Sequence, residues 1–336
     1  MLIADRLDRP FRDLRVSVTD RCNFRCRYCM PAEIYGERYQ FLPREDLLTF
    51  EEITRVVGIC VGLGAVKIRL TGGEPLVRND LERLVGDLAA VDGVADLTLT
   101  TNAYLLPQKA SALKEAGLHR VSVSLDTLDD EIFREMNGRG FGTAKVLEGI
   151  AAAETAGFHP IKVNAVVQRG VNDHTVVELA RYFRERGHIM RFIEYMDVGT
   201  RNGWRMDQVV PADEIVARID AEMPLEPMDG NYRGEVALRY RYADGRGEIG
   251  VIASVTKPFC GDCTRLRLSP EGSIYTCLFS SQGTDLRTPL RDGAGDDELQ
   301  SLITSVWNVR EDRYSETRTS LTSPVRDKVE MYHIGG

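Results

Sequence analysis

The sequence predicts an α/β protein: an incomplete (βα)6, TIM-like barrel over residues 1–198, followed by a C-terminal extension over residues 199–336. Three observations support this fold class. Short strand-like runs alternate with longer helix-like segments as far as about residue 196. Apolar and polar residues alternate within these runs, which gives each predicted strand one apolar and one polar face. Beyond about residue 199 the chain is rich in turn-forming residues.

The first part of the chain contains six predicted strands. Their expected bounds are 15–19, 66–71, 97–102, 120–126, 161–167 and 190–196. The intervening segments, such as DLLTFEEITRVVGICVGLG, NDLERLVGDLAAV and TVVELARYFRERG, have the apolar period of amphipathic helices and end in glycine or a turn. Strands separated by helices pair in parallel, so we expect a parallel sheet.

The polar face of these strands favours a barrel over a doubly wound sheet. In the second strand, for example, Arg69 and Thr71 share one face, whereas Ile68 and Leu70 share the other. A doubly wound parallel sheet is covered by helices on both faces, so its strands would be apolar throughout. In a barrel the apolar face meets the outer helices, and a polar inner face can line a lumen for a hydrophilic ligand. Six units instead of eight predict a barrel that is open on one side.

The composition predicts a soluble globular protein without a general attraction to polyanions. The chain has 336 residues, 43% of them hydrophobic, and 51 acidic against 43 basic residues give a net charge of −8. No stretch approaches a membrane span of roughly 18 uninterrupted apolar residues, and the N-terminus lacks the apolar core of a secretory signal. We therefore expect a cytoplasmic protein that binds neither nucleic acid nor membrane.

The first group of cysteines, Cys22-x3-Cys26-x2-Cys29, directly follows the first predicted strand. Cysteine thiolates hold iron–sulfur clusters, and three ligands to a 4Fe–4S cluster leave one iron open to a substrate. Loops after barrel strands are where active sites gather. A zinc site would need a fourth ligand and a thioredoxin-type pair has no third cysteine, so both alternatives fit this spacing less well.

The second group, Cys260-x2-Cys263-x13-Cys277, lies in the extension and again offers three ligands. Zinc ribbons use similar pairs, but a fourth ligand is not evident near this group. The segment between its members contains Arg265 and Arg267, which would place two cations beside a cluster.

The first cysteine motif, with Tyr28 before its last cysteine, resembles the signature of the radical S-adenosylmethionine (SAM) superfamily. In that superfamily the open iron chelates the amino and carboxylate groups of the methionine moiety of SAM. Gly72-Gly73-Glu74-Pro75, at the end of the second strand, resembles the segment that presents backbone and carboxylate groups to the SAM ammonium. Glycine permits such a close backbone approach.

An ordered set of segments over nearly the whole chain resembles the GTP 3',8-cyclase family of molybdenum cofactor biosynthesis. These segments are FRDLRVSVTDRCNFRCRYCMP, RLTGGEPLVR, TTN, VSVSLDTLD, IKVNAV, MRFIEYM, FCGDCTRLRLSPEG and the terminal Gly335-Gly336. The resemblance implies two 4Fe–4S clusters, with SAM as the source of a 5'-deoxyadenosyl radical. That radical would remove hydrogen from ribose C3' of GTP, and attack on guanine C8 would give (8S)-3',8-cyclo-7,8-dihydroguanosine 5'-triphosphate.

The same resemblance implies roles for individual residues. The metal ligands would be Cys22, Cys26, Cys29, Cys260, Cys263 and Cys277. SAM would be bound by Tyr28, Gly73, Glu74, Ser124 and Met196. GTP would be bound by Arg15, Arg69, Thr100, Lys162, Arg191, Arg265, Leu266 and Arg267, and catalysis would involve Gly335, Gly336, Arg265 and Arg267.

The predicted strand faces bear on these assignments independently of the family. The chain has no P-loop and no G-x-G-x-x-G after a strand, so a nucleotide would be held in another way. Arg15, Arg69 and Lys162 fall on the polar face, where a triphosphate would compensate their charge. The alternative is internal ion pairing with Glu74 or Asp126. Strict alternation also places Arg191 and Met196 on opposite faces, which predicts a bulge if both serve the site.

The resemblance implies partners as well: a reductant or electron donor, a downstream cyclic pyranopterin monophosphate synthase, and a second copy of the chain in a homodimer. Two other functions stay open on the sequence. One is a radical SAM peptide-modifying enzyme with an auxiliary cluster, which the lumen cations and the Gly-Gly tail argue against. The other is a non-catalytic iron–sulfur or zinc-binding protein.

Overall fold

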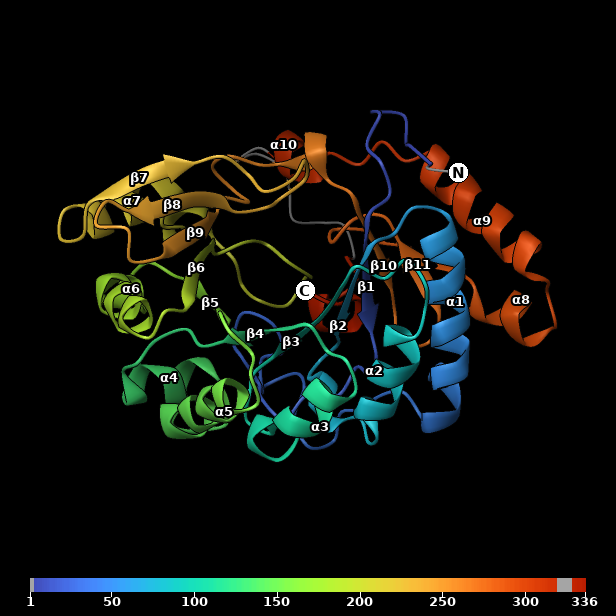
Figure 1. The fold of residues 1–336 in the computed structure, drawn as a ribbon, viewed down its shortest axis with the longest axis horizontal. Coiled ribbons are helices and arrows are strands. Elements are labelled where there is room, and N and C mark those ends of the chain that lie inside the picture. Colours follow the sequence, from blue (N-terminus) through green and yellow to red (C-terminus); the bar gives the residue numbers. More distant parts are fainter. Residues whose placement is uncertain (1–2, 319–327) are drawn as a thin grey trace.

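The computed structural model describes residues 3–318 and 328–336, and its centre is a twelve-stranded mixed sheet curved into an open arc (Figure 1). The strand order is β12-β11-β10-β1-β2-β3-β4-β5-β6-β9-β8-β7. β1 to β6 are parallel neighbours in chain order, and the sheet does not close on itself within the described residues. The predicted incomplete α/β barrel is confirmed.

All six predicted strands are present, within two residues of their expected bounds. They are β1 (Asp13–Ser17), β2 (Lys67–Thr71), β3 (Asp96–Thr101), β4 (Arg120–Ser124), β5 (Lys162–Val167) and β6 (Ile189–Glu194). β1 begins earlier than predicted because it has a partner on each side: Asp13 pairs with Lys67 of β2 and with Arg265 of the extension.

The C-terminal extension lengthens the sheet at both edges. β7 (Leu225–Met228), β8 (Leu238–Tyr242) and β9 (Glu248–Ile252) continue it beyond β6, and β10 (Arg265–Leu268), β11 (Ser273–Tyr275) and β12 (Thr284–Asp285) continue it beyond β1. β9 is parallel to β6 and β10 is parallel to β1, so eight neighbouring strands share one direction. These additions hydrogen-bond the backbone groups that a six-stranded sheet would leave free at its edges.

The helices that connect the barrel strands cover the outer side of the arc (Figure 1). They are α1 (Phe50–Gly62), α2 (Leu81–Ala89), α3 (Ala110–Glu115), α4 (Asp130–Met136), α5 (Thr143–Thr155) and α6 (Val176–Glu185). α1 begins at a capping box, in which Thr49 and Glu52 each bond the backbone N–H of the other. The remaining helices are α7 (Ala212–Asp220), α8 (Arg287–Arg291), α9 (Asp296–Asn308), α10 (Tyr314–Thr317) and α11 (Met331–Ile334).

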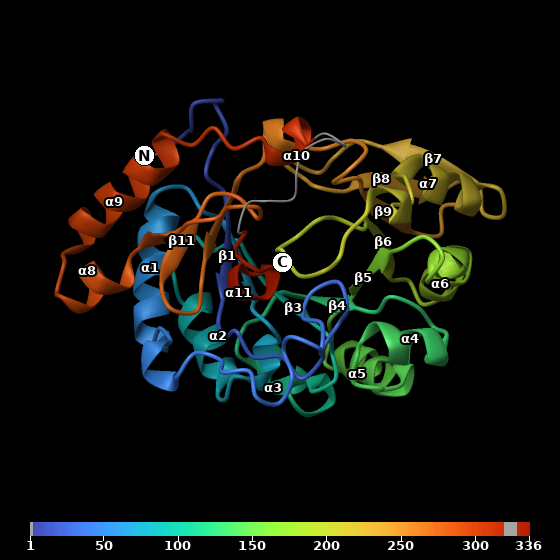
Figure 2. The same ribbon diagram turned by 180° about the vertical axis from the view of Figure 1, so that it is seen from behind.

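The outward-facing side chains of the strands form the main core with these helices. Val16, Ile68, Leu99, Val123 and Val163 are fully buried there. Their strand neighbours point to the concave side, as the alternation predicts. In both views the C-terminus lies inside the arc, with α11 next to β1 (Figure 1, Figure 2). None of the helices in the described ranges is long and apolar enough to cross a membrane.

Candidate functional site

One pocket on the concave side of the sheet, with a cavity volume of about 320 Å³, collects most of the residues predicted to act. Of those residues it is lined by Cys22, Cys26, Cys29, Cys260, Cys263, Cys277, Tyr28, Gly73, Glu74, Ser124, Met196, Arg15, Arg69, Thr100, Lys162, Arg191, Arg265, Arg267 and Gly336. Gly335 and Leu266 are not part of this lining.

Leu266 occupies the opposite face of β10 from the pocket. Its side chain is fully buried in the hydrophobic core, whereas its neighbours Arg265 and Arg267 line the pocket. Alternation along the strand explains this difference. The side chain of Leu266 therefore faces the core rather than the pocket, and the contact of Leu266 with GTP stays a prediction.

Arg191 and Met196 both line the pocket without the predicted bulge. β6 pairs with β9 in unbroken register from Met190 to Ile193, and the strand ends at Glu194. Met196 thus lies beyond the strand, where alternation no longer determines the direction of a side chain. The expectation of a bulge was wrong because the predicted strand was two residues too long.

The first cysteine group lies in the loop after β1, which an arginine holds in shape. The guanidinium of Arg25 donates to the carbonyl oxygens of Cys22 at 2.6 Å and of Phe24 at 2.7 Å. The backbone N–H of Cys29 donates to the carbonyl of Cys26 at 2.9 Å. These bonds turn the loop so that its three sulfurs line one end of the pocket.

The chemistry of this group fits an iron–sulfur cluster. Burial raises the pKa of all three thiols, to about 12 for Cys22, so positive charge must be supplied before they become thiolates. In residues 3–318 and 328–336, no three Cys, His, Asp or Glu side chains converge closely enough to hold a single metal ion. In a cluster each thiolate binds a different iron, so three sulfurs spread over one pocket wall suit it.

The glycines after β2 pack against the cysteine loop itself. A Cβ at Gly73 would lie 2.3 Å from the carbonyl oxygen of Arg21, and one at Gly72 would lie 2.5 Å from that of Thr19. The Gly73 N–H also donates to Thr19 at 2.8 Å. The missing side chains therefore let β2 meet the segment that positions Cys22, in addition to any ligand they face.

Glu74 has its carboxylate engaged by the protein. Its oxygens accept from the hydroxyl of Thr101 at 2.6 Å and from the backbone N–H of Asn102 at 2.7 Å. Burial raises the pKa of Glu74 to about 7, although these hydrogen bonds act in the opposite direction. Glu74 thus joins the end of β2 to the end of β3 at the rim of the pocket.

Tyr28 and Asp126 form a second polar contact at the same end. The Tyr28 hydroxyl donates to Asp126 at 2.8 Å, and the other oxygen of Asp126 accepts from the backbone N–H of Val166 at 2.9 Å. Burial raises the pKa of Asp126 to about 6. Neither Asp126 nor Glu74 pairs with the predicted substrate cations in the described part of the chain, so the ion-pair alternative for Arg15, Arg69 and Lys162 is not seen.

The second cysteine group lies at the opposite end of the strands. Because β10 runs parallel to β1, Cys260 and Cys263, which precede β10, lie at the end where β1 begins, whereas Cys22 follows the end where β1 stops. Burial alone would raise the pKa of Cys263, but Arg265 and Arg310 lower it to about 6. Cys277 follows β11, and burial raises its pKa to about 11.

Three arginines form a row across neighbouring strands in the middle of the pocket. Arg15 of β1 is the register partner of Arg267 on β10 and of Arg69 on β2. Burial lowers the pKa of Arg15, and the charges of Arg267 and Arg69 lower it further. The Nε atoms of Arg15 and Arg69 are buried and have no hydrogen-bond partner in the described ranges. In the described ranges no carboxylate forms an ion pair with the three residues of this arginine row, although the charge of Asp13 partly offsets that of Arg15.

Two further cations extend the positive wall. The pKa of Lys162 is lowered to about 8, mainly by burial and secondly by the positive charge of Arg191. Burial and the positive charge of Arg69 lower the pKa of Arg191 to about 9. Arg191 donates to the side-chain oxygen of Asn164 at 2.8 Å.

The C-terminal tail enters the pocket through α11. Tyr332 is 5% exposed and its hydroxyl lies 3.0 Å from that of Tyr39, while His333 pairs with Glu271 at 2.9 Å. Arg267 donates to the carbonyl oxygen of Gly335. Gly335 has φ +75°, and a Cβ there would lie 2.3 Å from Thr71, so this position suits glycine. The predicted pair of terminal glycines thus lies at the arginine row.

The lining also contains residues for which no role was predicted, including Lys67, Arg120 and Arg310. Lys67 is two residues before Arg69 on β2 and therefore shares its face, so the alternation pattern could have identified it as a pocket residue. In the structure Lys67 forms an ion pair with Asp13 at 3.6 Å. No sequence motif around Arg310 indicates a role in the site. Arg310 follows the end of α9 and reaches the site only through tertiary packing.

Family models match two consecutive parts of the chain. The Radical SAM superfamily model matches residues 16–183, and the Molybdenum Cofactor Synthesis C model matches residues 188–316.

Curated relatives match the chain over nearly its full length. A GTP 3',8-cyclase of Acidothermus cellulolyticus is 55% identical over 358 aligned residues, which cover 99% of each chain. GTP 3',8-cyclases of Xanthomonas axonopodis pv. citri and Staphylococcus haemolyticus are 51% and 46% identical, each covering 99% of both chains.

Solved structures show the same architecture at low identity. The crystal structure of Streptococcus suis SuiB bound to S-adenosylmethionine superposes with a TM-score of 0.62 at 14% identity, covering 88% of this chain and 68% of that one. SuiB bound to precursor peptide SuiA gives a TM-score of 0.60 at 16% identity, covering 88% and 67%. At these identities the similarity shows the fold alone.

Proposed function

The chain belongs to the radical SAM superfamily and, within it, to the GTP 3',8-cyclase family, and we propose that it converts GTP to 3',8-cyclo-GTP with SAM as the source of the radical. The observation that carries this proposal is the arginine row. Arg267, Arg15 and Arg69 stand side by side on one pocket wall, between a cysteine group at each end of the strands.

The arginine row supports a triphosphate as the ligand. Three guanidinium groups offer planar, forked donors that match phosphate oxygens, and the buried Nε atoms of Arg15 and Arg69 still lack partners in the described residues. Phosphate charge would also relieve the repulsion that lowers the pKa of Arg15. Lys162, Arg191 and Thr100 extend the same polar wall and are proposed to position the rest of GTP.

The two cysteine groups are proposed to hold two 4Fe–4S clusters, with Cys22, Cys26 and Cys29 binding one and Cys260, Cys263 and Cys277 the other. A cluster held by Cys22, Cys26 and Cys29 would supply the electron for reductive cleavage of SAM, and a cluster held by Cys260, Cys263 and Cys277 would supply a binding site for the purine. The chain keeps three ligands on each side of the arginine row, which suits a substrate that lies between the clusters.

SAM is proposed to bind at the carboxyl ends of β1 to β6. Tyr28, Gly73, Ser124 and Met196 line the pocket there. Since Glu74 already accepts hydrogen bonds from Thr101 and Asn102, we propose that it acts chiefly by fixing this rim for SAM.

The tail is proposed to help position GTP. The bond from Arg267 to the Gly335 carbonyl joins the chain end to the arginine row, and Gly336 lines the pocket. This placement supports a role for Gly335 and Gly336 in turnover together with Arg265 and Arg267, and it shields the pocket on one side.

The partners follow from the proposed reaction. Reductive cleavage of SAM requires an electron donor, and the cyclised nucleotide requires a downstream enzyme, for which we propose a cyclic pyranopterin monophosphate synthase. We further propose that the protein works in the cytoplasm as a homodimer.

The proposal is tested by incubating the anaerobically reconstituted chain with SAM, GTP and dithionite. We expect 5'-deoxyadenosine and the cyclised nucleotide in equal amounts, measured by liquid chromatography and mass spectrometry. Omission of GTP should leave only slow SAM cleavage. SAM cleavage that depends on an added peptide rather than on GTP would refute the proposal, as would a chain that binds zinc and contains no acid-labile sulfide.

A further inference from the structure

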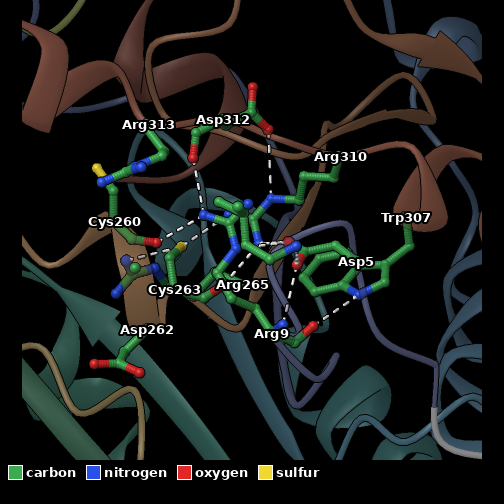
Figure 3. Close-up of polar contacts among 12 residues, drawn as sticks. Asp5, Arg9, Cys260, Asp262, Cys263, Arg265, Trp307, Arg310, Asp312 and Arg313 are labelled. Carbon is green, nitrogen blue, oxygen red and sulfur yellow. Dashed lines mark hydrogen bonds and ion pairs between the residues drawn. The ribbon is translucent and has the colours of Figure 1, made fainter.

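A buried charged network of Asp5, Arg9 and Arg310 lies against the second cysteine group (Figure 3). The exposed fractions of these side chains are 0% for Asp5 and Arg9 and 1% for Arg310. Asp5 joins the two arginines, with contacts of 2.6 Å to Arg9 and 3.2 Å to Arg310. The network therefore ties the N-terminal segment to the residues after α9.

Arg310 contacts Cys263 at two points. Its Nη1 donates to the Cys263 carbonyl oxygen at 2.6 Å and its Nη2 donates to the Cys263 sulfur at 3.0 Å. Its Nε pairs with Asp312 at 3.3 Å, and the guanidinium carbon lies 4.7 Å from the centroid of the Trp307 ring. A guanidinium held on all these sides keeps its N–H bond directed at the sulfur.

Arg9 holds the neighbouring cysteine without touching a sulfur. Its Nη1 donates to the carbonyl oxygen of Cys260 at 2.7 Å and to that of Asp312 at 2.8 Å. The backbone oxygen of Arg9 in turn accepts from the indole of Trp307 at 3.2 Å. Arg9 and Arg310 thus share a carboxylate and an environment, but only Arg310 reaches a sulfur atom.

The network of Asp5, Arg9 and Arg310 has a net positive charge next to the sulfur of Cys263. Two buried guanidinium groups face one fully buried carboxylate, that of Asp5, which leaves one positive charge in excess. Asp312 compensates it only in part, because its side chain is 32% exposed and lies 3.3 Å away. The other group in contact with Arg310 is the sulfur of Cys263, at 3.0 Å, which would carry negative charge as a ligand of the cluster.

Arg265 also donates to the Cys263 sulfur, at 3.0 Å, but its surroundings differ. Its guanidinium stacks on the ring of Phe259, with the carbon 5.0 Å from the ring centroid, and it has no ion pair with a carboxylate in the described part of the chain. A substrate anion in the pocket can compete for Arg265. Arg310, which is bound to Asp5 and Asp312, stays on the sulfur.

We propose that Arg310 is a positioning residue for the second cluster: it fixes Cys263 through both its carbonyl and its sulfur and raises the reduction potential of the cluster bound there. This inference rests on the proposed function, which places a cluster on Cys260, Cys263 and Cys277. A cluster gains negative charge on reduction, so a fixed cation and an N–H···S bond stabilise the reduced form more than the oxidised one.

The test compares the full-length holoenzyme with its Arg310→Gln variant in redox titrations followed by electron paramagnetic resonance. We expect the midpoint potential of the second cluster to shift to a more negative value in Arg310→Gln. The first cluster, at the other end of the strands, serves as the reference and should not shift. The signal of the second cluster is assigned in a Cys22→Ala, Cys26→Ala, Cys29→Ala chain, which retains only the second cysteine group.

The matched control is Arg9→Gln. It removes a guanidinium that is equally buried and bonded to the same Asp5 but makes no contact with sulfur, so the shift should be absent or clearly smaller. Equal shifts in Arg9→Gln and Arg310→Gln would overturn the proposal, because the effect would then come from the network in general.

Cluster loading provides a second readout. An iron content between about four and about eight per chain in Arg310→Gln, against about eight in Arg310→Lys, would show partial loss of the second cluster and would support positioning of Cys263 by this cation. Unchanged potential and unchanged iron in Arg310→Gln would overturn the inference while leaving the proposed function intact. A wild-type chain without a second cluster would instead refute the proposed function, and the inference with it.

Discussion

Arg15 on β1 and Arg267 on β10 are register partners on adjacent parallel strands, so two buried guanidinium groups face the same pocket side by side. Burial and the charge of neighbouring Arg265 together lower the pKa of Arg267 to about 10. An arrangement of this kind weakens the protein without ligand and favours an anion that bridges the pair.

The variant Arg15→Gln should bind GTP more weakly but resist heat at least as well as the wild type. A charge-assisted hydrogen bond contributes about 1.5–3 kcal/mol, so the Kd for GTP should rise roughly 10- to 150-fold. Thermal unfolding without ligand should shift upward or stay the same, because a buried repulsion is removed. Calorimetry under anaerobic conditions measures both quantities. Arg241→Gln, which removes an exposed pair with Glu226 at the sheet edge, should change neither.

Lys162 should make the stability of the ligand-free protein rise with pH in the mildly alkaline range. Its pKa is about 8 in the folded chain against 10.5 ordinarily, because of burial and the charge of Arg191. Between these values the unfolded chain binds the proton and the folded chain does not, so the free energy of unfolding increases from about pH 8 to pH 10.5. Below that range both states are protonated and this contribution does not vary.

The measurement compares denaturant unfolding of the wild type and of Lys162→Met at several pH values. Lys162→Met should show a smaller rise over the same range, and parallel curves for the two proteins would contradict the assignment. GTP affinity should fall as pH rises through about 8 in the wild type only, because a neutral amine no longer attracts phosphate.

Gly73→Ala should remove the first cluster and spare the second. A methyl group there would lie 2.3 Å from the backbone oxygen of Arg21 and so would displace the segment that leads to Cys22. We expect iron content to fall from about eight to about four per chain. Gly58→Ala is the control, since a Cβ in the middle of α1 meets no atom within 4 Å and should stabilise the helix by about 0.5–1 kcal/mol.

Deletion of Gly335 and Gly336 should abolish turnover while both clusters stay in place. The deletion removes the carbonyl that Arg267 contacts and opens the pocket beside the arginine row, but it touches none of the cysteines. Iron content, the cluster absorption spectrum and product formation test this outcome together. Undiminished product formation by the shortened chain would exclude the tail from the mechanism.

The local patterns of the sequence were sufficient for the barrel and for much of the pocket. Alternation within a strand is a local property, so the pocket-facing positions of Arg15, Arg69 and Lys162 were predictable before any strand was placed. The spacing of Cys22, Cys26 and Cys29 likewise confines three sulfurs to one loop whatever the rest of the chain does. Alternation failed only past the end of β6, at Met196, where the chain is no longer a strand.

Only the tertiary structure decided what those residues meet. The parallel pairing of β10 with β1 puts Arg267 beside Arg15, and it arises from two segments that are about 250 residues apart. Asp5 and Arg310 likewise meet although 305 positions separate them in the sequence. The close approach of Gly73 to the backbone of Arg21 also depends on how distant segments pack. Periodicity and spacing describe how a short segment folds and which face it exposes. Pairing across the sheet depends on which segments pack together, and that is settled by the burial of the whole chain.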